Sequence, residues 1–130
     1  VFIEGNGATI DLEQGNGIWI YSDENYPASI VLEYVSIINS SYFAISFSGS
    51  AEGIIKNCNF ISNDYGISLY DSSNIEVKNS NFINSTTYGI AIYTEIPICN
   101  ISYCNFYNND SADYMENCPG SLTIKYRYLK

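Results

Sequence analysis

Two aspartates are the side chains of this chain best suited to acid–base chemistry. Asp64 and Asp110 hold corresponding places in a sequence repeat, with Thr87 at that place in the repeat between them. If the repeats stack as neighbouring strands, the two carboxylates lie about 10 Å apart, just beyond the ~6.5–9.5 Å separation used by inverting glycosidases. Aspartates at such corners usually form turns or stay solvated. The sequence therefore predicts no catalytic residue, no metal ligand and no cofactor.

Four cysteines offer thiol chemistry without a metal-binding pattern. The chain has no Cys-x-x-Cys pair and no histidine to complete a zinc site. Cys58 and Cys104 lie two repeats apart, ~9.6 Å, which is too far for a disulfide and indicates small buried thiols. Cys99 and Cys118 flank an irregular repeat, where a disulfide between them would join its ends. An oxidising compartment would favour that bond.

Four Asn-x-Ser/Thr sequons could accept N-linked glycans. They begin at Asn39, Asn84, Asn100 and Asn109. Some matches are expected by chance in a chain rich in Asn and Ser, but Asn39, Asn84 and Asn109 all follow an apolar position and come near a corner. These three would be exposed along one edge, which predicts a secreted glycoprotein if the source glycosylates its proteins.

The positions of these side chains depend on a repeat of 22 to 24 residues. One block reads NCNF, NSNF and YCNF from Asn57, Asn79 and Tyr103, and a second reads GIWI, AISF, GISL and GIAI from Gly17, Ala44, Gly66 and Gly89, with a degenerate copy at Ala112. Within each repeat apolar and polar residues alternate, which indicates short strands, and Asn, Asp, Ser and Gly clusters between them indicate corners. Two blocks in a constant register are typical of a solenoid.

A coil of this length with three strands returns to its start one strand spacing along an axis, which is one rung of a parallel β-helix. Stacking then predicts core columns of like residues. The three columns are Leu32, Ile55, Val77, Ile101 and Ile124; Ile37, Phe60, Phe82 and Phe106; and Ile45, Ile67 and Ile90. Val35, Cys58, Ser80 and Cys104 form a column of small side chains. Asn57 and Asn79 fall at a bend, where their amides are expected to form a ladder.

The repeat resembles the right-handed parallel β-helix family, the pectin-lyase-like or periplasmic copper-protein-like repeat proteins. We therefore predict an all-β fold, a right-handed parallel β-helix (β-solenoid) of about five rungs plus a partial sixth. The chain is expected to form one domain, 1–130, with rungs at roughly 2–24, 30–52, 53–74, 75–98, 99–121 and 122–130.

The resemblance leaves function open, because this superfamily includes polysaccharide lyases, hydrolases, epimerases and adhesins. Its hydrolases carry aspartate pairs and a G-H-G motif, whereas this chain has no histidine and only Asn63-Asp64-Tyr65-Gly66 where a double aspartate would be. We therefore expect a protein that is not an enzyme. Metal delivery is not expected either, because the chain lacks histidine and a Met cluster.

Charge and hydropathy limit the partners. The net charge is −9 with five basic residues, so the positive surface that binds nucleic acid is missing. No apolar run is long enough to span a membrane. The chain starts at Val1 without a signal peptide, so it is expected to be processed or cut from a larger protein.

The two ends of the coil differ in charge. The first rung carries Glu4, Asp11 and Glu13 among its acidic residues, and the last carries Lys125, Arg127 and Lys130. Opposite charges would favour head-to-tail self-association into a filament. Continuation of the solenoid in a larger chain and simple protection of edge strands explain the same pattern, so all three remain open.

Tyrosines form a further pattern, with Tyr42, Tyr65 and Tyr88 at nearly equivalent places on three successive rungs. Such a strip could stack on sugar rings, pack against another protein, or stabilise the solenoid by stacking on itself. The sequence thus predicts a non-enzymatic extracellular structural module of a cell-surface or filament-forming protein. The alternative is a carbohydrate-binding or polysaccharide-processing β-helix.

Overall fold

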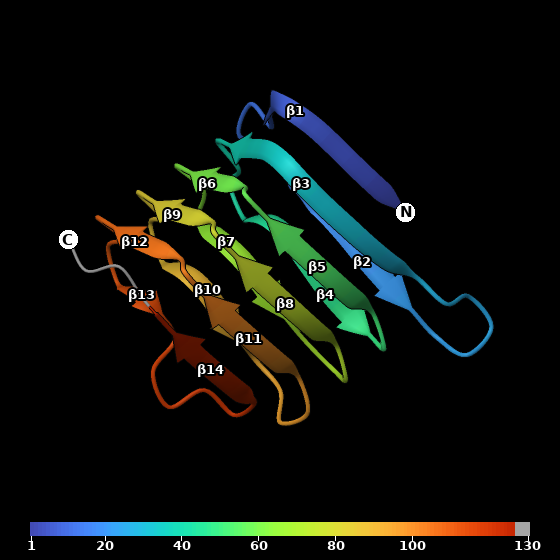
Figure 1. Cartoon of the computed structure of the whole chain (residues 1–130). Coiled ribbons are helices and arrows are strands. Elements are labelled where there is room, and N and C mark those ends of the chain that lie inside the picture. Colours follow the sequence, from blue (N-terminus) through green and yellow to red (C-terminus); the bar gives the residue numbers. More distant parts are fainter. Residues whose placement is uncertain (127–130) are drawn as a thin grey trace.

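Strands wind in successive turns around one axis in the computed structural model of the protein, which describes residues 1–126 (Figure 1). No helix occurs among these residues. The strands are β1 (Phe2–Asp11), β2 (Ile18–Ser22), β3 (Ser29–Ile38), β4 (Phe43–Gly49), β5 (Glu52–Lys56), β6 (Asn59–Ile61), β7 (Tyr65–Leu69), β8 (Asn74–Lys78), β9 (Asn81–Ile83), β10 (Tyr88–Ile92), β11 (Ile98–Ser102), β12 (Asn105–Tyr107), β13 (Ala112–Tyr114) and β14 (Ser121–Lys125).

Three parallel faces result from this winding. Sheet 1 contains the first halves of β1 and β3 with β5, β8, β11 and β14; sheet 2 contains their second halves with β6, β9 and β12; sheet 3 contains β2, β4, β7, β10 and β13. All strand pairs are parallel, since each strand pairs with its equivalent one turn later. The predicted all-β parallel β-helix is confirmed, with β14 beginning a sixth turn.

The corner between sheets 1 and 2 is made by residues with left-handed backbone. Tyr34, Asn57, Asn79 and Tyr103 have φ of 54°, 54°, 49° and 55°. Asparagine tolerates this conformation well and tyrosine less so. The amide ladder predicted at the two asparagines lies elsewhere: Asn81 Nδ2 donates to Asn59 Oδ1 at 2.7 Å, on outward positions of sheet 2 two residues further along.

The three predicted core columns are confirmed. Leu32, Ile55, Val77, Ile101 and Ile124 are successive partners in sheet 1, as are Ile37, Phe60, Phe82 and Phe106 in sheet 2 and Ile45, Ile67 and Ile90 in sheet 3. The phenyl rings of Phe60, Phe82 and Phe106 stack face to face with 5.0 Å between successive centroids. Aliphatic and aromatic side chains thus fill the interior from turn to turn.

The glycine that opens the Gly-Ile blocks is explained by close backbone approach. A Cβ on Gly66 would lie 2.5 Å from the carbonyl oxygen of Gly89 and 2.8 Å from the ring of Phe82. A larger side chain on Gly66 would push the neighbouring turn away, which explains the glycine there. The requirement does not extend to the whole sheet, since Ala44 and Asp113 hold the equivalent positions in β4 and β13.

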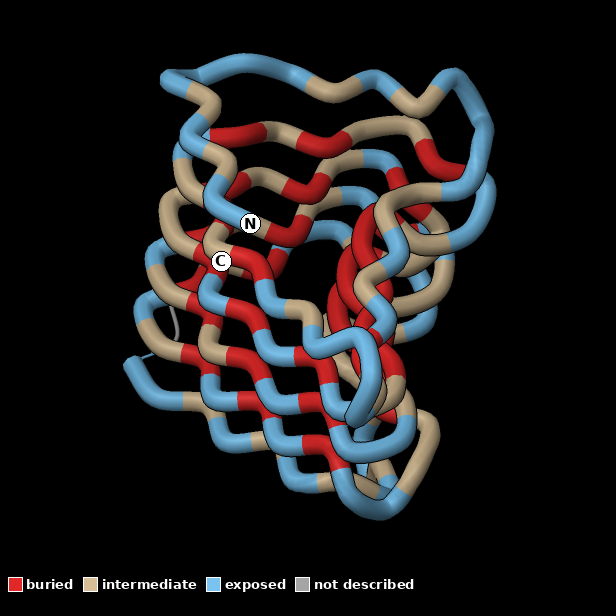
Figure 2. Tube along the Cα trace, turned by 90° about the vertical axis from the view of Figure 1, so that its right-hand side faces the viewer, coloured by how far each residue is buried: buried red, intermediate tan, exposed pale blue. Residues whose placement is uncertain are grey.

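Burial differs between the sheets. Strands of sheet 1 such as β8 alternate between buried and more exposed residues, whereas β4, β7 and β10 are buried along almost their whole length (Figure 2). Alternation is expected for a sheet with one face in solvent. Continuous burial shows that side chains cover the outer face of sheet 3 as well.

Candidate functional site

The acidic residues predicted to mediate end contacts lie together on the first turn. Glu4, Asp11 and Glu13 are all exposed. Asp11 Oδ1 accepts hydrogen bonds from Glu13 N at 3.0 Å and Asn39 Nδ2 at 3.1 Å, and Glu4 Oε1 accepts one from Asn6 N at 2.8 Å. These carboxylates therefore also support the local turns of the first rung.

Among the basic residues of the prediction, Lys125 falls within the described part of the chain. Lys125 is exposed at the last position of β14, at the opposite end of the solenoid from β1 (Figure 1). Arg127 and Lys130 lie outside the described residues. Within residues 1–126 the structure thus places Glu4, Asp11 and Glu13 on the first turn and Lys125 on the last strand, while Asp110, Asp113 and Glu116 lie at or beside β13.

One outward column of sheet 1 connects the two ends. Its members, in order along the axis, are Glu4, Glu33, Lys56, Lys78, Ser102 and Lys125. Acidic groups occupy the first two turns and basic groups most of the later ones. Lys78 Nζ also contacts Glu76 Oε1 of the same strand at 2.9 Å. The column carries a charge gradient along the axis.

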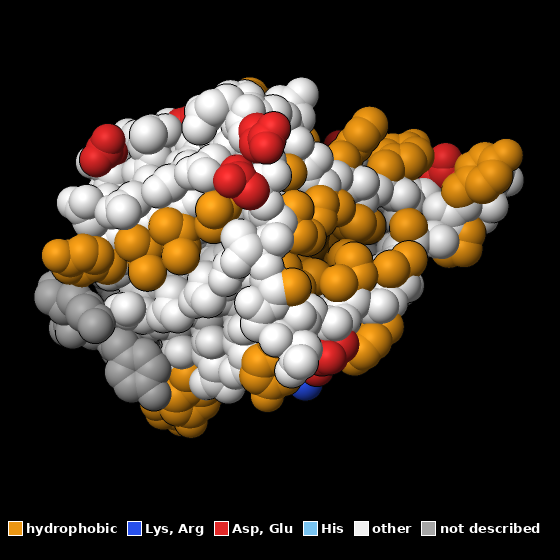
Figure 3. Space-filling model, turned by 90° about the horizontal axis from the view of Figure 1, so that it is seen from above, with side chains coloured by type: hydrophobic (Ala, Val, Ile, Leu, Met, Phe, Trp, Pro, Cys, Tyr) orange, Lys and Arg blue, Asp and Glu red, His pale blue; other side chains and the backbone are white. Residues whose placement is uncertain are grey.

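Both ends expose apolar residues that are buried in every inner turn. Ile3, Ile10, Ile18 and Ile20 on the first turn are only partly buried, although their partners one turn on are fully buried. Leu122 and Ile124 are partly buried at the other end. The view from above, the side of β1, shows hydrophobic side chains gathered near the centre with acidic side chains close by (Figure 3).

The four sequon asparagines differ in what their amides do. Asn100 and Asn84 are exposed, on the outer face of β11 and at a corner. Asn39 and Asn109 are partly buried. Asn109 is the most engaged: its Oδ1 accepts from Ser85 N at 2.9 Å, and its Nδ2 donates to Phe82 O and Asp113 Oδ1 at 3.1 Å each. A glycan on Asn109 would disrupt these bonds, whereas Asn84 and Asn100 are accessible.

The cysteines are free thiols in the structure. Cys58 and Cys104 are buried in the predicted small column, where their thiols donate to the carbonyls of Lys56 and Ser102 at 3.2 and 3.4 Å. Burial raises the pKa of Cys104 to about 11. It raises the pKa of fully buried Cys99 further, with Cys104 and Cys118 nearby adding to the shift. The Cys99–Cys118 disulfide stays a prediction.

The aspartates are not arranged as the sequence suggests. The register pairs Tyr65 with Tyr88 and Tyr88 with Ala112 on successive turns. The residues just before them, Asp64, Thr87 and Ser111, therefore share one column. Asp110 lies one place earlier in the chain than that column. The shared column predicted for Asp64 and Asp110 is therefore wrong, because the corner before β10, like the one before β13, holds one residue more than the corner before β7. Asp64 Oδ1 instead accepts the hydroxyls of Thr86 at 2.7 Å and Thr87 at 2.5 Å.

Tyrosines cover the outer face of sheet 3. Ring centroids of Tyr42, Tyr65 and Tyr88 are 5.6 and 6.3 Å apart on successive turns. Tyr70 and Tyr93, which follow β7 and β10, stack at 5.2 Å. The Tyr70 side chain is hydrogen-bonded to that of Tyr42, and the Tyr93 side chain to that of Tyr65. The two rows therefore meet over the middle of the sheet, so that the tyrosines stack on one another across successive turns.

Burial and these hydrogen bonds keep the phenols protonated. Burial is the largest cause that raises the pKa of Tyr70 to about 12, and the hydrogen bond to Tyr42 adds to it. The pKa of Tyr93 is shifted upward further for the same two reasons, with Tyr65 as its partner. We name this set, Tyr42, Tyr65, Tyr70, Tyr88 and Tyr93, the tyrosine lattice.

An aromatic hollow lies where the tyrosine lattice ends, over the first turns of sheet 3. Its volume is about 440 Å³, and it is lined by Trp19, Tyr21, Tyr42, Phe43, Ser46, Ser48, Tyr70 and Asp71. Sequence reasoning did not single out Trp19. The available signal was its place in the second repeat block, where Ser46, Ser68 and Ala91 stand in later turns.

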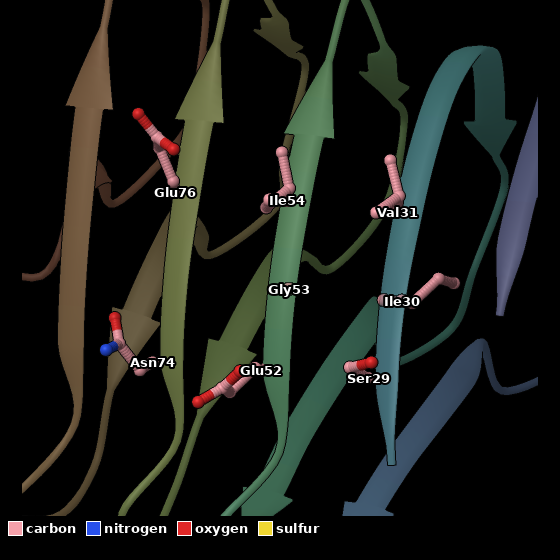
Figure 4. A pocket seen from close by; sticks show the side chains of 8 residues that line it. All are labelled: Ser29, Ile30, Val31, Glu52, Gly53, Ile54, Asn74 and Glu76. Carbon is pink, nitrogen blue, oxygen red and sulfur yellow. The ribbon is translucent and has the colours of Figure 1, made fainter.

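A second depression lies on the outer face of sheet 1, over β3, β5 and β8 (Figure 4). It has a volume of about 320 Å³, and Glu52, Ile54, Asn74 and Glu76 contribute side chains to it. It is a shallow part of a solvated face, with Glu76 already paired to Lys78. No convergent set of polar groups marks it as a reactive site.

Two other kinds of site are absent from the described part of the chain. Across residues 1–126, no three His, Cys, Asp or Glu side chains come together in a way that could hold a metal ion. In the same range we find no helix with the length and apolar character needed to cross a membrane.

Stacked parallel strands, corner residues repeated every turn and a continuous apolar interior define a β-solenoid protein. The family model described as right handed beta helix region matches residues 2–128, and the chain belongs to this family. No curated protein and no solved structure matches the chain. The family establishes the fold and its hand, and it includes proteins of different activities.

Proposed function

We propose that this chain is a non-enzymatic structural β-solenoid module of an extracellular, cell-surface or filament-forming protein, and that copies of it stack head to tail. The observation that carries the proposal is the position of Glu4 and Lys125 at opposite ends of one side-chain column. If a second copy continues the coil in register, Lys125 of one copy lies opposite Glu4 of the next, on strands about 4.8 Å apart.

The apolar interior supports the same register. Ile124 and Ile3 end one core column, and stacking would place them in contact, as each member of that column contacts the next within the chain. Burying partly exposed aliphatic side chains contributes roughly 25 cal/mol for each Å² removed from water.

Backbone hydrogen bonding favours the junction further. Among the described residues, β1 pairs only with β3 and β14 only with β11, so each has one free edge. A free edge is a ready template for pairing with another strand. Because the two edges belong to opposite ends, the contact is heterologous and propagates as a filament.

Two further observations support a structural role outside the cell. Asp64, the aspartate considered for catalysis, is held by two threonine hydroxyls of the next turn, as expected for a turn residue. Asn84 and Asn100 are exposed, which leaves two sequons open to glycosylation in a secretory pathway. The acidic composition suits an exposed protein that must remain soluble.

Charge reversal at the junction tests the proposal. Sedimentation velocity and electron microscopy of the purified chain at rising concentration and low salt should show end-to-end oligomers that dissociate in high salt, since salt screens exposed charges. Glu4→Lys and Lys125→Glu should each prevent assembly. Mixing the two variants should restore it, because every junction between unlike variants again joins a basic side chain to an acidic one.

Lys78→Glu is the matched control, because Lys78 lies in the same column on an inner turn and should leave assembly unchanged. Dispersed monomers of the original chain at high concentration and low salt would refute head-to-tail stacking and favour continuation of the solenoid in a longer chain. Assembly that persists in both Glu4→Lys and Lys125→Glu would indicate that the free strand edges pair without a contribution from these charges.

A further inference from the structure

The aromatic hollow differs from the rest of sheet 3 in being open. Trp19, Ser46, Ser68 and Ala91 are partners in one outward row. The last three are 2%, 0% and 0% exposed, because the tyrosine lattice spans the sheet above them, whereas Trp19 is 63% exposed. The lattice therefore stops one turn short of the first rung and leaves an indole ring facing solvent.

The exposed indole is held in place. Trp19 Nε1 donates to Ser48 Oγ at 2.6 Å, and the ring of Tyr21 lies 5.8 Å away at an interplanar angle of 53°. Tyr42 packs edge-on against Phe43 at 5.3 Å on the far wall. A ligand would thus meet preoriented rings, so little side-chain entropy is lost on binding.

The hollow combines apolar walls with hydrogen-bonding groups at its edges. Ser46, Tyr42 and Tyr70, which carry hydroxyls, line the same space as the indole, and so does Asp71. Asp71 Oδ2 accepts from Gly49 N at 2.8 Å, which fixes the carboxylate. Its volume of about 440 Å³ is within the ~300–1,000 Å³ usual for small-molecule pockets.

We propose that this aromatic hollow binds one or two pyranose rings of a neutral glycan. A pyranose has an apolar face of C–H groups that suits the indole and phenol rings, and hydroxyls around its edge that suit serine, tyrosine and aspartate. Asp71 is the charged residue of the lining, and the chain carries a net charge of −9. Both disfavour uronates and other acidic sugars.

The inference is independent of head-to-tail stacking. All lining residues come from the first three turns of one chain, so the hollow is complete without a second copy. It also opens outward from sheet 3, whereas the stacking contacts lie at the ends of the coil. Each proposal can therefore fail while the other stands.

Trp19 provides a direct readout, because it is the single tryptophan of the chain. Titration with cellohexaose, chitohexaose and mannohexaose, with hexagalacturonate as the acidic probe, should give a saturable fluorescence change with at least one neutral oligosaccharide and none with the acidic one. Isothermal titration calorimetry would confirm the affinity without relying on the indole.

Tyr21→Ala should weaken binding about tenfold, as expected when one stacking aromatic ring is lost, while Trp19 still reports. Tyr107→Ala is the control, because Tyr107 is an exposed tyrosine on sheet 2, away from the hollow. No saturable change with any neutral probe, tighter binding of hexagalacturonate, or unchanged affinity of Tyr21→Ala would overturn the proposal. A fluorescence change with protein concentration alone, lost in Tyr21→Ala, would instead identify a self-interface and also overturn it.

Discussion

The phenyl rings of Phe60 and Phe82 stack with 5.0 Å between their centroids and an interplanar angle of 10°, and Phe106 continues the stack on the next turn. Each ring belongs to a different turn of the coil. Side-chain stacking thus joins successive turns through the interior, in addition to the backbone hydrogen bonds of the sheets.

The middle ring should matter most for stability. We expect Phe82→Ala to lower the free energy of unfolding by about 3–5 kcal/mol, the usual cost of removing a buried phenyl ring and leaving a cavity. Urea denaturation followed by circular dichroism measures this change. Ile96→Ala is the control, because Ile96 is 67% exposed in a loop and its truncation should cost little. Equal losses in both variants would contradict the role assigned to the stack.

Asn109 and Asn100 should respond differently to substitution, although both begin sequons. Asn109→Ala removes an acceptor for the backbone N–H of Ser85 and two donated hydrogen bonds, which we expect to cost about 1–3 kcal/mol. Asn100→Ala should be nearly neutral, because Asn100 is exposed on sheet 1. Thermal unfolding of the two variants tests this contrast, and similar melting temperatures would refute it.

Glycan occupancy should follow the same distinction. Expression of the chain in a eukaryotic secretory pathway is expected to modify Asn84 and Asn100 and to leave Asn109 unmodified, because the amide of Asn109 is held inside a corner. Mass spectrometry before and after glycosidase treatment reads each site separately. Full occupancy at Asn109 would show that glycosylation precedes closure of that corner.

Alkaline pH should destabilise the protein. The pKa of Cys104 is raised to about 11 and that of Tyr70 to about 12 in the folded chain, so both groups stay protonated there while the unfolded chain ionises near its ordinary values. The unfolded state then binds fewer protons, and stability falls with rising pH. We expect the free energy of unfolding to be constant through neutral pH and to decline above about pH 9.

Tyr93→Phe separates the contribution of the tyrosines to the alkaline loss of stability from that of the cysteines. Its phenol pKa is raised by burial and by the hydrogen bond to Tyr65, so its removal should make the alkaline decline shallower. Urea midpoints measured across the alkaline range give the slope for the variant and for Tyr107→Phe, which removes an exposed phenol on sheet 2. An unchanged slope in Tyr93→Phe would contradict the contribution of the tyrosine lattice.

Thiol labelling tests the cysteines. Under native, reducing conditions we expect a thiol reagent to modify Cys118 first, because it is partly exposed, and Cys58, Cys99 and Cys104 only after unfolding. Under oxidising conditions, loss of the Cys118 label together with a crosslinked Cys99–Cys118 peptide would verify the predicted disulfide. A Cys118 that remains fully reactive after oxidation would exclude it.

The sequence alone determined the solenoid, its core columns and the placement of Glu4 and Lys125 at opposite ends of it. These features repeat once per turn, so that a period and an alternation of apolar residues are sufficient to assign them. Leu32, Ile55 and Val77 could be placed in one column from spacing, because parallel in-register strands put equivalent residues above one another. The position of Lys125 relative to Glu4 follows from the same register.

Only the tertiary structure decided what happens at corners and across faces. Asp110 lies one place away from its expected column, since a corner can take up an extra residue without disturbing the strands on either side. Tyr42 meets Tyr70, and Trp19 remains uncovered, because rings from opposite ends of different strands reach one another over small side chains. Those contacts depend on the directions of the side chains and on which turns are present. The local pattern of residues determines neither.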